Sequence, residues 1–256
     1  MEMPCQPVYA VPLDRPYRSG TGQGTMSRRR FDALFIDYYG TLADGDRLAV
    51  ETTCARVVED LALPMTAAEL AITWGRRFFQ EIEVANHDRF LNLYDCEART
   101  LVDTLEPLGV DADPRLYCDM LKHYWATAPA HADALAALAG LDVPVCCVSN
   151  ADTDDITASI ARHGFRLDAV VVSEAVRCYK PDPHIFRVAL DALGVSPERV
   201  LHVGDSLHSD VGGAQSAGIA TAWICRNGRI FDTGQSTPDY KIHSLIELHT
   251  ILGQSA

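Results

Sequence analysis

The hydrophobic positions of this chain gather in five short continuous runs. The first run is ALFI at residues 33–36. The others are VPVCCVS (143–149), DAVVVS (168–173), RVLHVGD (199–205) and IATAWIC (219–225). Near-continuous hydrophobicity, rather than alternation with polar residues, is typical of parallel strands that are covered on both faces. The pattern therefore predicts a buried parallel sheet.

Helical patterns separate the later runs. The stretch at 154–165 reaches a glycine at a plausible helix end, and the stretch at 182–195 has a proline near its start and a glycine near its end. Proline at the start and glycine at the end are typical of helices. A third stretch, at 209–218, is rich in small residues, which suits close packing on a sheet. Strands that alternate with helices over short links predict a doubly wound (Rossmann-like) α/β fold.

A long helical insertion lies between the first run and the second. Residues 47–127 show helical patterns throughout, and a segment of this length is too long for a loop. It predicts an α-helical cap domain inserted into a core made of residues 31–46 and 128–256. Residues 1–30 combine prolines, a Gly/Ser/Thr cluster and an arginine run with no helical or strand period. They are expected to form a flexible leader.

Composition narrows the classes of partner. The net charge is −13 and 48% of the residues are hydrophobic. A surface this acidic argues against nucleic acid or an anionic membrane as the main partner, and no run approaches the roughly 18 apolar residues of a membrane span. The eight cysteines are scattered without a CxxC pair, which predicts reduced thiols in a cytoplasmic protein. We expect a small anionic substrate and a monomer or homodimer.

Polar residues follow the ends of three predicted strands. Asp37 follows the first, Ser149 and Asn150 end the second, and Asp205 ends the fourth. In an open α/β sheet, ligands bind outside the carboxyl ends of the strands. These side chains are therefore expected to converge, although they are far apart in the sequence.

Four motifs carry a resemblance to a known family. DYYGTL (37–42), VSN (148–150), YKPDP (179–183) and GDSLHSD (204–210), in this order and at strand ends, resemble the motifs of the haloacid dehalogenase (HAD) superfamily of hydrolases. The likeness runs from about residue 31 to about residue 230, and the helical insertion resembles the cap of that family. The resemblance implies that Asp37 is a nucleophile that forms a covalent aspartyl intermediate.

The resemblance also implies roles for the neighbours of Asp37. Thr41 is expected to donate a hydrogen bond to the nucleophile or to the transferred group. Ser149 and Asn150 are expected to donate to substrate oxygens. The ammonium of Lys180 is expected to neutralise the charge of the substrate near Asp37.

The fourth motif suggests a metal ion. Asp205 and Asp210, together with Asp37 and the backbone carbonyl of Tyr39, form an oxygen ligand set of the kind that suits Mg²⁺. Such an ion would shield the repulsion between Asp37 and a phosphate dianion.

Tyr39 favours a different reaction. In the phosphatases of the family this position is usually an aspartate, which acts as general acid and then as general base. In the 2-haloacid dehalogenases it is typically a tyrosine, and a halide leaves without needing a proton. A phenol with its ordinary pKa near 10 is a poor base at neutral pH.

The two signals conflict, because the dehalogenases use no metal and resemble S-x-N-x-x-D in the fourth motif, where this chain has Asp205, Leu207 and Asp210. We give more weight to the carboxylates and expect Mg²⁺-dependent hydrolysis of a small phosphomonoester. A metal-independent 2-haloacid dehalogenase is a close second. Hydrolysis at another carbon centre and a catalytically quiet member that binds a ligand or protein through its cap remain further alternatives.

The cap is expected to contribute a partly apolar pocket. Its aromatic residues should belong more often to the cap core than to the pocket. Arg76 and Arg77 are candidates for holding the halide in the dehalogenase alternative. The aromatic candidates are Trp74, Phe78, Phe79, Phe90, Tyr94, Tyr124 and Trp125.

Overall fold

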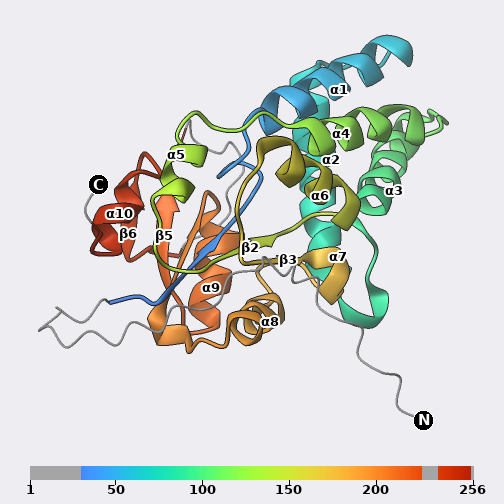
Figure 1. Ribbon diagram of the computed structural model, residues 1–256. Coiled ribbons are helices and arrows are strands. Elements are labelled where there is room, and N and C mark those ends of the chain that lie inside the picture. Colours follow the sequence, from blue (N-terminus) through green and yellow to red (C-terminus); the bar gives the residue numbers. More distant parts are fainter. Residues whose placement is uncertain (1–29, 227–235, 255–256) are drawn as a thin grey trace, which may run out of the picture.

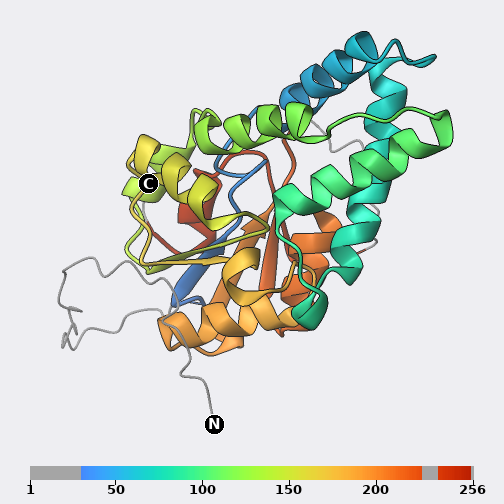
Figure 2. The same ribbon diagram turned by 90° about the vertical axis from the view of Figure 1, so that its right-hand side faces the viewer.

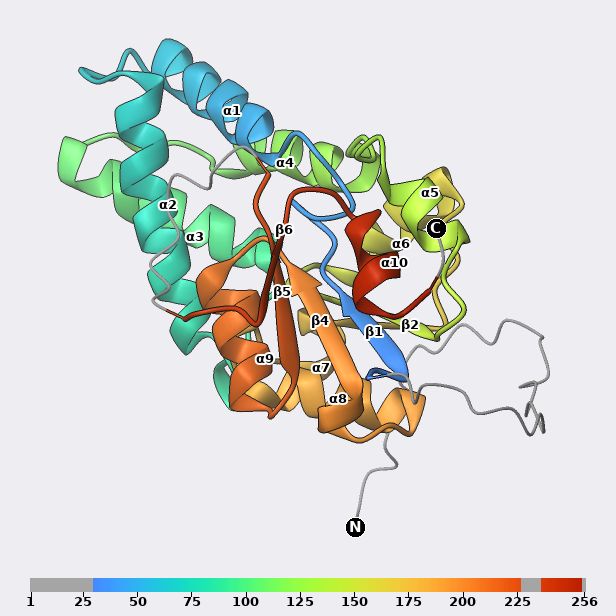
Figure 3. The ribbon, with the colours of Figure 1, turned by 90° about the vertical axis from the view of Figure 1, so that its left-hand side faces the viewer.

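A six-stranded parallel sheet forms the centre of the computed structural model, which describes residues 30–226 and 236–254. The strand order is β3-β2-β1-β4-β5-β6, and Figure 3 shows β1 and β4 in the middle of the sheet. The doubly wound Rossmann-like fold is confirmed, and each of the five hydrophobic runs contains a strand. The strands are β1 (Ala33–Ile36), β2 (Val145–Ser149), β3 (Ala169–Val172), β4 (Val200–Gly204), β5 (Ala220–Ile224) and β6 (Tyr240–Ile242).

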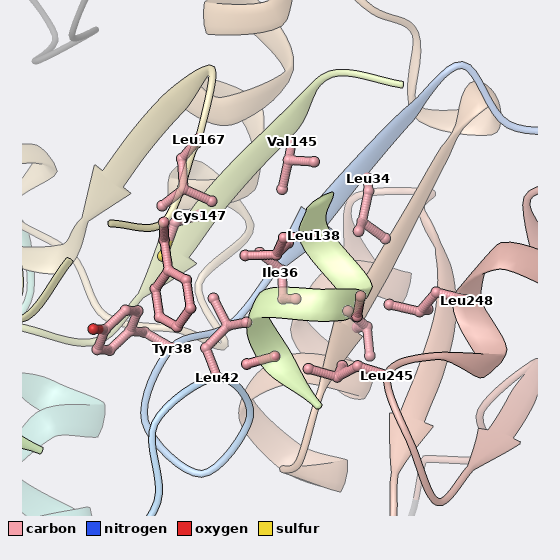
Figure 4. Packing of buried hydrophobic residues seen from close by; sticks show 14 of the residues in the cluster. Leu34, Ile36, Tyr38, Leu42, Leu138, Val145, Cys147, Leu167, Leu245 and Leu248 are labelled. Carbon is pink, nitrogen blue, oxygen red and sulfur yellow. The ribbon is translucent and has the colours of Figure 1, made fainter. Parts of the chain in front are cut away.

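Helices cover both faces of this sheet. Successive side chains of a strand point to opposite sides, so each strand contributes to both layers of the core. Phe35 of β1 belongs to the hydrophobic cluster that includes residues of α8 (Pro183–Leu193) and α9 (Gly213–Ser216). Leu34 and Ile36 belong to the opposite cluster, with residues of α5 (Ala134–Ala139), α6 (Thr153–His163) and α10 (Glu247–Ile251). Figure 4 shows this second cluster around β1 and β2. Burial on both faces explains why the strands read as continuous apolar runs.

Four helices form the inserted cap, whose hydrophobic cluster includes Trp74, Leu101 and Leu121. In Figures 1 and 2 they stand to one side of the sheet, away from α10. A capping box between Thr66 and Glu69 begins the cap helix that follows Thr66. The domain boundaries at residues 47 and 127 stay a prediction. The cap helices are α1 (Asp46–Asp60), α2 (Ala67–Val84), α3 (Leu93–Leu105) and α4 (Arg115–Thr127).

The two linkers between core and cap lie side by side. Ala43 on the outgoing linker forms an antiparallel bridge with Ala130 on the returning one. The amide of Asp44 donates to the carbonyl of Pro129 at 2.7 Å. The chain therefore leaves the core and re-enters it at one place, a few residues after Asp37.

A second connection between cap and core involves Asp152, just before α6. Its carboxylate accepts hydrogen bonds from the first two backbone amides of α3, those of Leu93 at 2.7 Å and Tyr94 at 3.0 Å. Because these amides have no partner within their own helix, a carboxylate there also interacts favourably with the helix dipole. The start of α3 is thereby tied to the core.

The remaining expectations concern the leader, membrane-spanning helices and the cysteines. The proposed flexible leader, residues 1–30, lies outside the described residues except for Arg30. Within the described part of the chain, none of the helices combines the length and hydropathy that a membrane crossing needs. The seven cysteines of the described ranges are free thiols.

A buried hydrogen bond between the strand-end loop and α6 provides a stability test. The hydroxyl of Tyr38 donates to Oγ of Ser159 at 2.7 Å, and both residues are fully buried. Tyr38→Phe should lower the free energy of unfolding by about 1–2 kcal/mol, because the serine hydroxyl loses its partner. The measurement is urea unfolding followed by circular dichroism.

Tyr94→Phe is the matched control for this test. Its hydroxyl donates to Asp119 at an exposed position, and its removal should change the stability by less than about 0.5 kcal/mol. Equal changes for the two variants would contradict the structural role given to the buried bond.

Candidate active site

Asp37 lies directly after β1, at the carboxyl edge of the sheet. Its amide donates to the carbonyl of Val203 at 2.9 Å, which extends the pairing with β4 and orients the residue. The side chain is buried but lines a cavity of about 650 Å³. Ser149 at the end of β2 and Asp205 after β4 line the same cavity. The structure thus brings the strand ends together around one space.

The ammonium of Lys180 connects two of the carboxylates. Its Nζ lies 2.7 Å from Oδ1 of Asp37 and 2.6 Å from Oδ1 of Asp210, and it also donates to the carbonyl of Val148 at 2.9 Å. Burial alone would lower the pKa of Lys180, but the carboxylates of Asp210 and Asp37 together raise it above its usual value. The lysine is therefore charged and holds Asp37 in place.

Asp210 is held by protein donors on both of its oxygens. Oδ1 faces the Lys180 ammonium and lies 3.1 Å from Nε2 of His202, while Oδ2 accepts from the amide of Ser206 at 3.0 Å. Burial would raise the pKa of Asp210, but the lysine and the histidine hold it below its usual range. Asp210 is therefore an ionised anchor for Lys180.

The side-chain amide of Asn150 binds the backbone of Lys180. Its Oδ1 accepts from the backbone amide of Lys180 at 2.7 Å, and its Nδ2 donates to the backbone carbonyl of Lys180 at 3.1 Å. Asn150 also lines the cavity. The two bonds position the lysine, so both ends of the amide are engaged.

Thr41 is fully buried and is not among the residues that line the cavity. Within the described residues its hydroxyl has no hydrogen-bond partner. The role expected for Thr41, a hydrogen bond to the nucleophile or the transferred group, stays a prediction.

Tyr39 lines the cavity with its ring and points its hydroxyl at the cap. The hydroxyl donates to the carbonyl of Trp125, near the end of α4, at 2.9 Å. Burial, and then the neighbouring Tyr38, raise the pKa of Tyr39 far above its ordinary value. The phenol is therefore neutral, and its proton is donated to the carbonyl of Trp125. That carbonyl lies in the last turn of α4, where carbonyls have no partner within the helix.

The carboxylates fit a divalent cation in chemistry and spacing. Oxygens of Asp37, Asp205 and Asp210 lie within 4.8 Å of one another, and carboxylate oxygens are the ligands that Mg²⁺ prefers. Gly40 keeps the space beside them open, since a Cβ there would lie 2.5 Å from Oδ2 of Asp205. The oxygens of Asp210, however, already accept from protein donors. The Mg²⁺ expectation stays a prediction.

The cap half of the cavity is lined in part by aromatic residues. Four of the seven aromatic candidates line it, namely Trp74, Phe78, Phe79 and Trp125. Six of the seven, all but Phe79, belong to the hydrophobic cluster of the cap or pack against it. The expectation that more of them belong to the cap core than to the pocket is therefore confirmed, although Trp74, Phe78 and Trp125 do both.

The two arginine candidates of the cap lie outside the cavity lining. Arg76 and Arg77 do not line the cavity in the described structure, whereas Arg47 and Arg226 do. Arg226 also pairs with Asp133 at 2.8 Å. It follows β5 and belongs to no motif, so no pattern in the sequence marks it.

Glu97 is a second cavity residue that sequence reasoning missed. It sits on α3 among positions that are otherwise apolar or small, such as Leu93, Cys96 and Leu101. A carboxylate at helical spacing within a buried face is a signal that could have identified it.

Comparison with known proteins adds independent findings. The family model for haloacid dehalogenase-like hydrolases matches residues 31–218. An (S)-2-haloacid dehalogenase from Xanthobacter autotrophicus is 30% identical over 76% of this chain and 75% of its own length. Another, from Pseudomonas sp. (strain YL), is 28% identical over 83% of this chain and 90% of its own length.

The fold has solved counterparts as well. The structure of L-2-haloacid dehalogenase from Xanthobacter autotrophicus superposes with a TM-score of 0.71. It is 24% identical and covers 88% of this chain and 100% of that chain. At this identity the likeness concerns the fold.

These findings correct one expectation. Mg²⁺-dependent phosphomonoester hydrolysis as the main activity is wrong. Relatives named phosphatases match only 33% or 36% of the chain, whereas those named haloacid dehalogenases match most of it. The carboxylates of GDSLHSD do not by themselves require a metal ion, because Lys180 pairs with Asp210 as well as with Asp37.

The family itself follows from the extent of the match. The family model covers residues 31–218, which is well over half of the chain. The chain belongs to the haloacid dehalogenase-like hydrolases.

Proposed function

We propose that this protein is a 2-haloacid dehalogenase that hydrolyses the bond between carbon 2 and the halogen without a metal ion. The observation that carries the proposal is the contact of the Tyr39 hydroxyl with the carbonyl of Trp125. A phosphatase of this family needs a proton donor at that position, and this phenol is neither free nor acidic enough. The names of the relatives that match most of the chain support the same reaction.

The first step is a displacement by Asp37. A carboxylate oxygen attacks carbon 2, the carbon–halogen bond breaks, and its electron pair leaves with the halide. The products of the step are an aspartyl ester and a halide ion. Lys180 keeps Asp37 ionised and oriented before the attack. Because a halide is stable as an anion, no general acid is required.

The second step is hydrolysis of the ester. Water attacks the carboxyl carbon of Asp37, the ester bond breaks, and a 2-hydroxy acid leaves with the regenerated carboxylate and one proton released. The ammonium of Lys180 lies beside Oδ1 of Asp37 and can stabilise the negative charge that develops on that oxygen.

An anionic substrate meets several cationic groups on the cavity wall. Lys180, Arg47 and Arg226 all line the cavity. Ser149, at the end of β2, adds a hydroxyl on the same wall. These groups offset the acidic residues around the site and would hold the carboxylate of the haloacid.

Magnesium binding is a separate proposal. Asp37, Asp205 and Asp210 with the backbone carbonyl of Tyr39 would hold the ion, and it would shield the repulsion among the carboxylates. The proposed displacement at carbon does not depend on it, because Lys180 already compensates the charge of Asp37.

Asp37→Asn tests the proposed nucleophile. The wild-type protein should release chloride or bromide from short 2-haloacids, and the variant should lose at least about 10³-fold in rate, because an amide oxygen is a poor nucleophile. Halide release is measured with an ion-selective electrode. Asp191→Asn, at an exposed position on the core, is the matched control and should keep full activity. No halide release from any 2-haloacid would end the proposal.

Tyr39→Phe tests whether the phenol has a chemical role. The variant keeps the ring on the cavity wall and loses only the bond to Trp125. The kcat/KM for halide release should fall by less than about tenfold, the loss expected for one hydrogen bond. A loss of about 10²- to 10⁴-fold is expected for a general acid or base and would contradict this account.

The matched control for Tyr39→Phe is Tyr124→Phe. The Tyr124 hydroxyl donates to the carbonyl of Asp44 at 3.1 Å, and the residue is not among those that line the cavity. Similar small effects in both variants would support a purely structural contact.

Chelation tests the metal-independent reaction. Halide release should be unchanged after dialysis against EDTA, because neither the displacement nor the departure of the halide requires a metal ion in this mechanism. A rate that EDTA abolishes and Mg²⁺ restores would show that the ion takes part.

A further inference from the structure

Glu97 is a buried carboxylate without a partner in the cap half of the cavity. It belongs to α3 and is 8% exposed. Its side chain takes part in no hydrogen bond or ion pair within residues 30–226 and 236–254. Its backbone carbonyl accepts from Nε1 of Trp74, but this leaves the carboxyl group unused.

Glu97 differs in this respect from the other buried carboxylates. Five carboxylates are buried in the described structure. Lys180 donates to those of Asp37 and Asp210, backbone amides donate to Asp152, and Lys122 donates to Asp155. A buried ionisable group without a partner is costly, so its position on a cavity wall indicates that the partner is a ligand.

The surroundings of Glu97 are apolar and negative. Trp74 and Trp125 line the same cavity, as do the acidic residues Asp46 and Glu51. Burial, and then the charge of Asp46, raise the pKa of Glu97 to about 8. A cation placed there would relieve the repulsion among the carboxylates and could also lie against the faces of the indoles.

The size of the cavity leaves room for such a ligand. About 650 Å³ lies well inside the range of about 300–1,000 Å³ that pockets for drug-sized ligands occupy. A three-carbon haloacid at Asp37 would leave much of this space empty. Asp37 and Glu97 line the same cavity, one from the core and one from the cap.

We propose that Glu97 forms a second subsite that binds a primary ammonium group at the far end of the substrate, while the reacting end lies at Asp37. The inference rests on the proposed function for the reacting end only. The substrate class is a straight-chain 2-haloacid that carries an ammonium group on its terminal carbon. Glu97 acts as a specificity-determining residue, since it touches the tail and not the reacting atoms.

Binding to the full-length Asp37→Asn variant tests the subsite without turnover. Titration calorimetry compares three series of halogen-free straight-chain acids, lengthened by one methylene at a time. One series ends in an ammonium, one in a hydroxyl and one in a methyl group. At one chain length, the ammonium acid should bind at least about tenfold more tightly than both others, as for a charge-assisted hydrogen bond.

A bound ammonium favours the ionised form of Glu97. Glu97→Gln in the same background should remove the preference, because the amide keeps the shape but cannot ionise. Burial holds the carboxyl group of Glu97 mostly protonated at neutral pH when no cation is bound, so a neutral amide of the same shape is expected to leave the fold intact. The matched control is Glu106→Gln, which removes a charge from an exposed position directly after α3 and should keep the preference.

Three outcomes would overturn the subsite. They are equal binding of the ammonium and methyl series at every length, equal binding of the hydroxyl and ammonium acids, and a preference that survives Glu97→Gln. Halide release by the wild-type protein is measured separately. If no 2-haloacid is turned over while the ammonium preference holds, the proposed function fails and the subsite stands. If 2-haloacids are turned over but the ammonium preference is absent, the subsite is rejected and the proposed function stands.

Discussion

The ammonium of Lys180 lies between the carboxylates of Asp37 and Asp210, and all three groups are buried. Two carboxylates this close would repel each other and raise their pKa values if no cation lay between them. The lysine lets Asp37 remain ionised at the mouth of β1. Removing one partner of a buried ion pair typically costs about 3–5 kcal/mol, because the remaining charge is left uncompensated.

Much of the architecture at this edge keeps that lysine in position. Asn150 at the end of β2 binds both backbone groups of Lys180, and the carbonyl of Val148 accepts from its ammonium. β1 lies between β2 and β4 in the sheet, so the residues that follow these strands surround the same point. The core thus supplies the buried ion pairs around Asp37, while the cap supplies most of the apolar wall of the cavity.

The sequence was sufficient for the parts that depend on local patterns. The five hydrophobic runs predicted five strands, and residues at the strand ends were expected to converge. Contacts between distant segments were not predictable. The bond from Tyr39 to Trp125 joins residues 86 positions apart, and no pattern near DYYGTL indicates it. Arg226 and Glu97 line the cavity through tertiary packing, and β6 has only three residues, too few for a period.

The bridge between Ala43 and Ala130 has a consequence for how the protein could change over generations. The two ends of the insertion meet at this bridge, so the cap leaves the core and returns to it at one place. Insertions are tolerated best where their ends lie close together. The cap can therefore be lengthened, shortened or exchanged without altering the register of the sheet. The cap wall of the cavity can therefore evolve independently of the residues at the strand ends of the core.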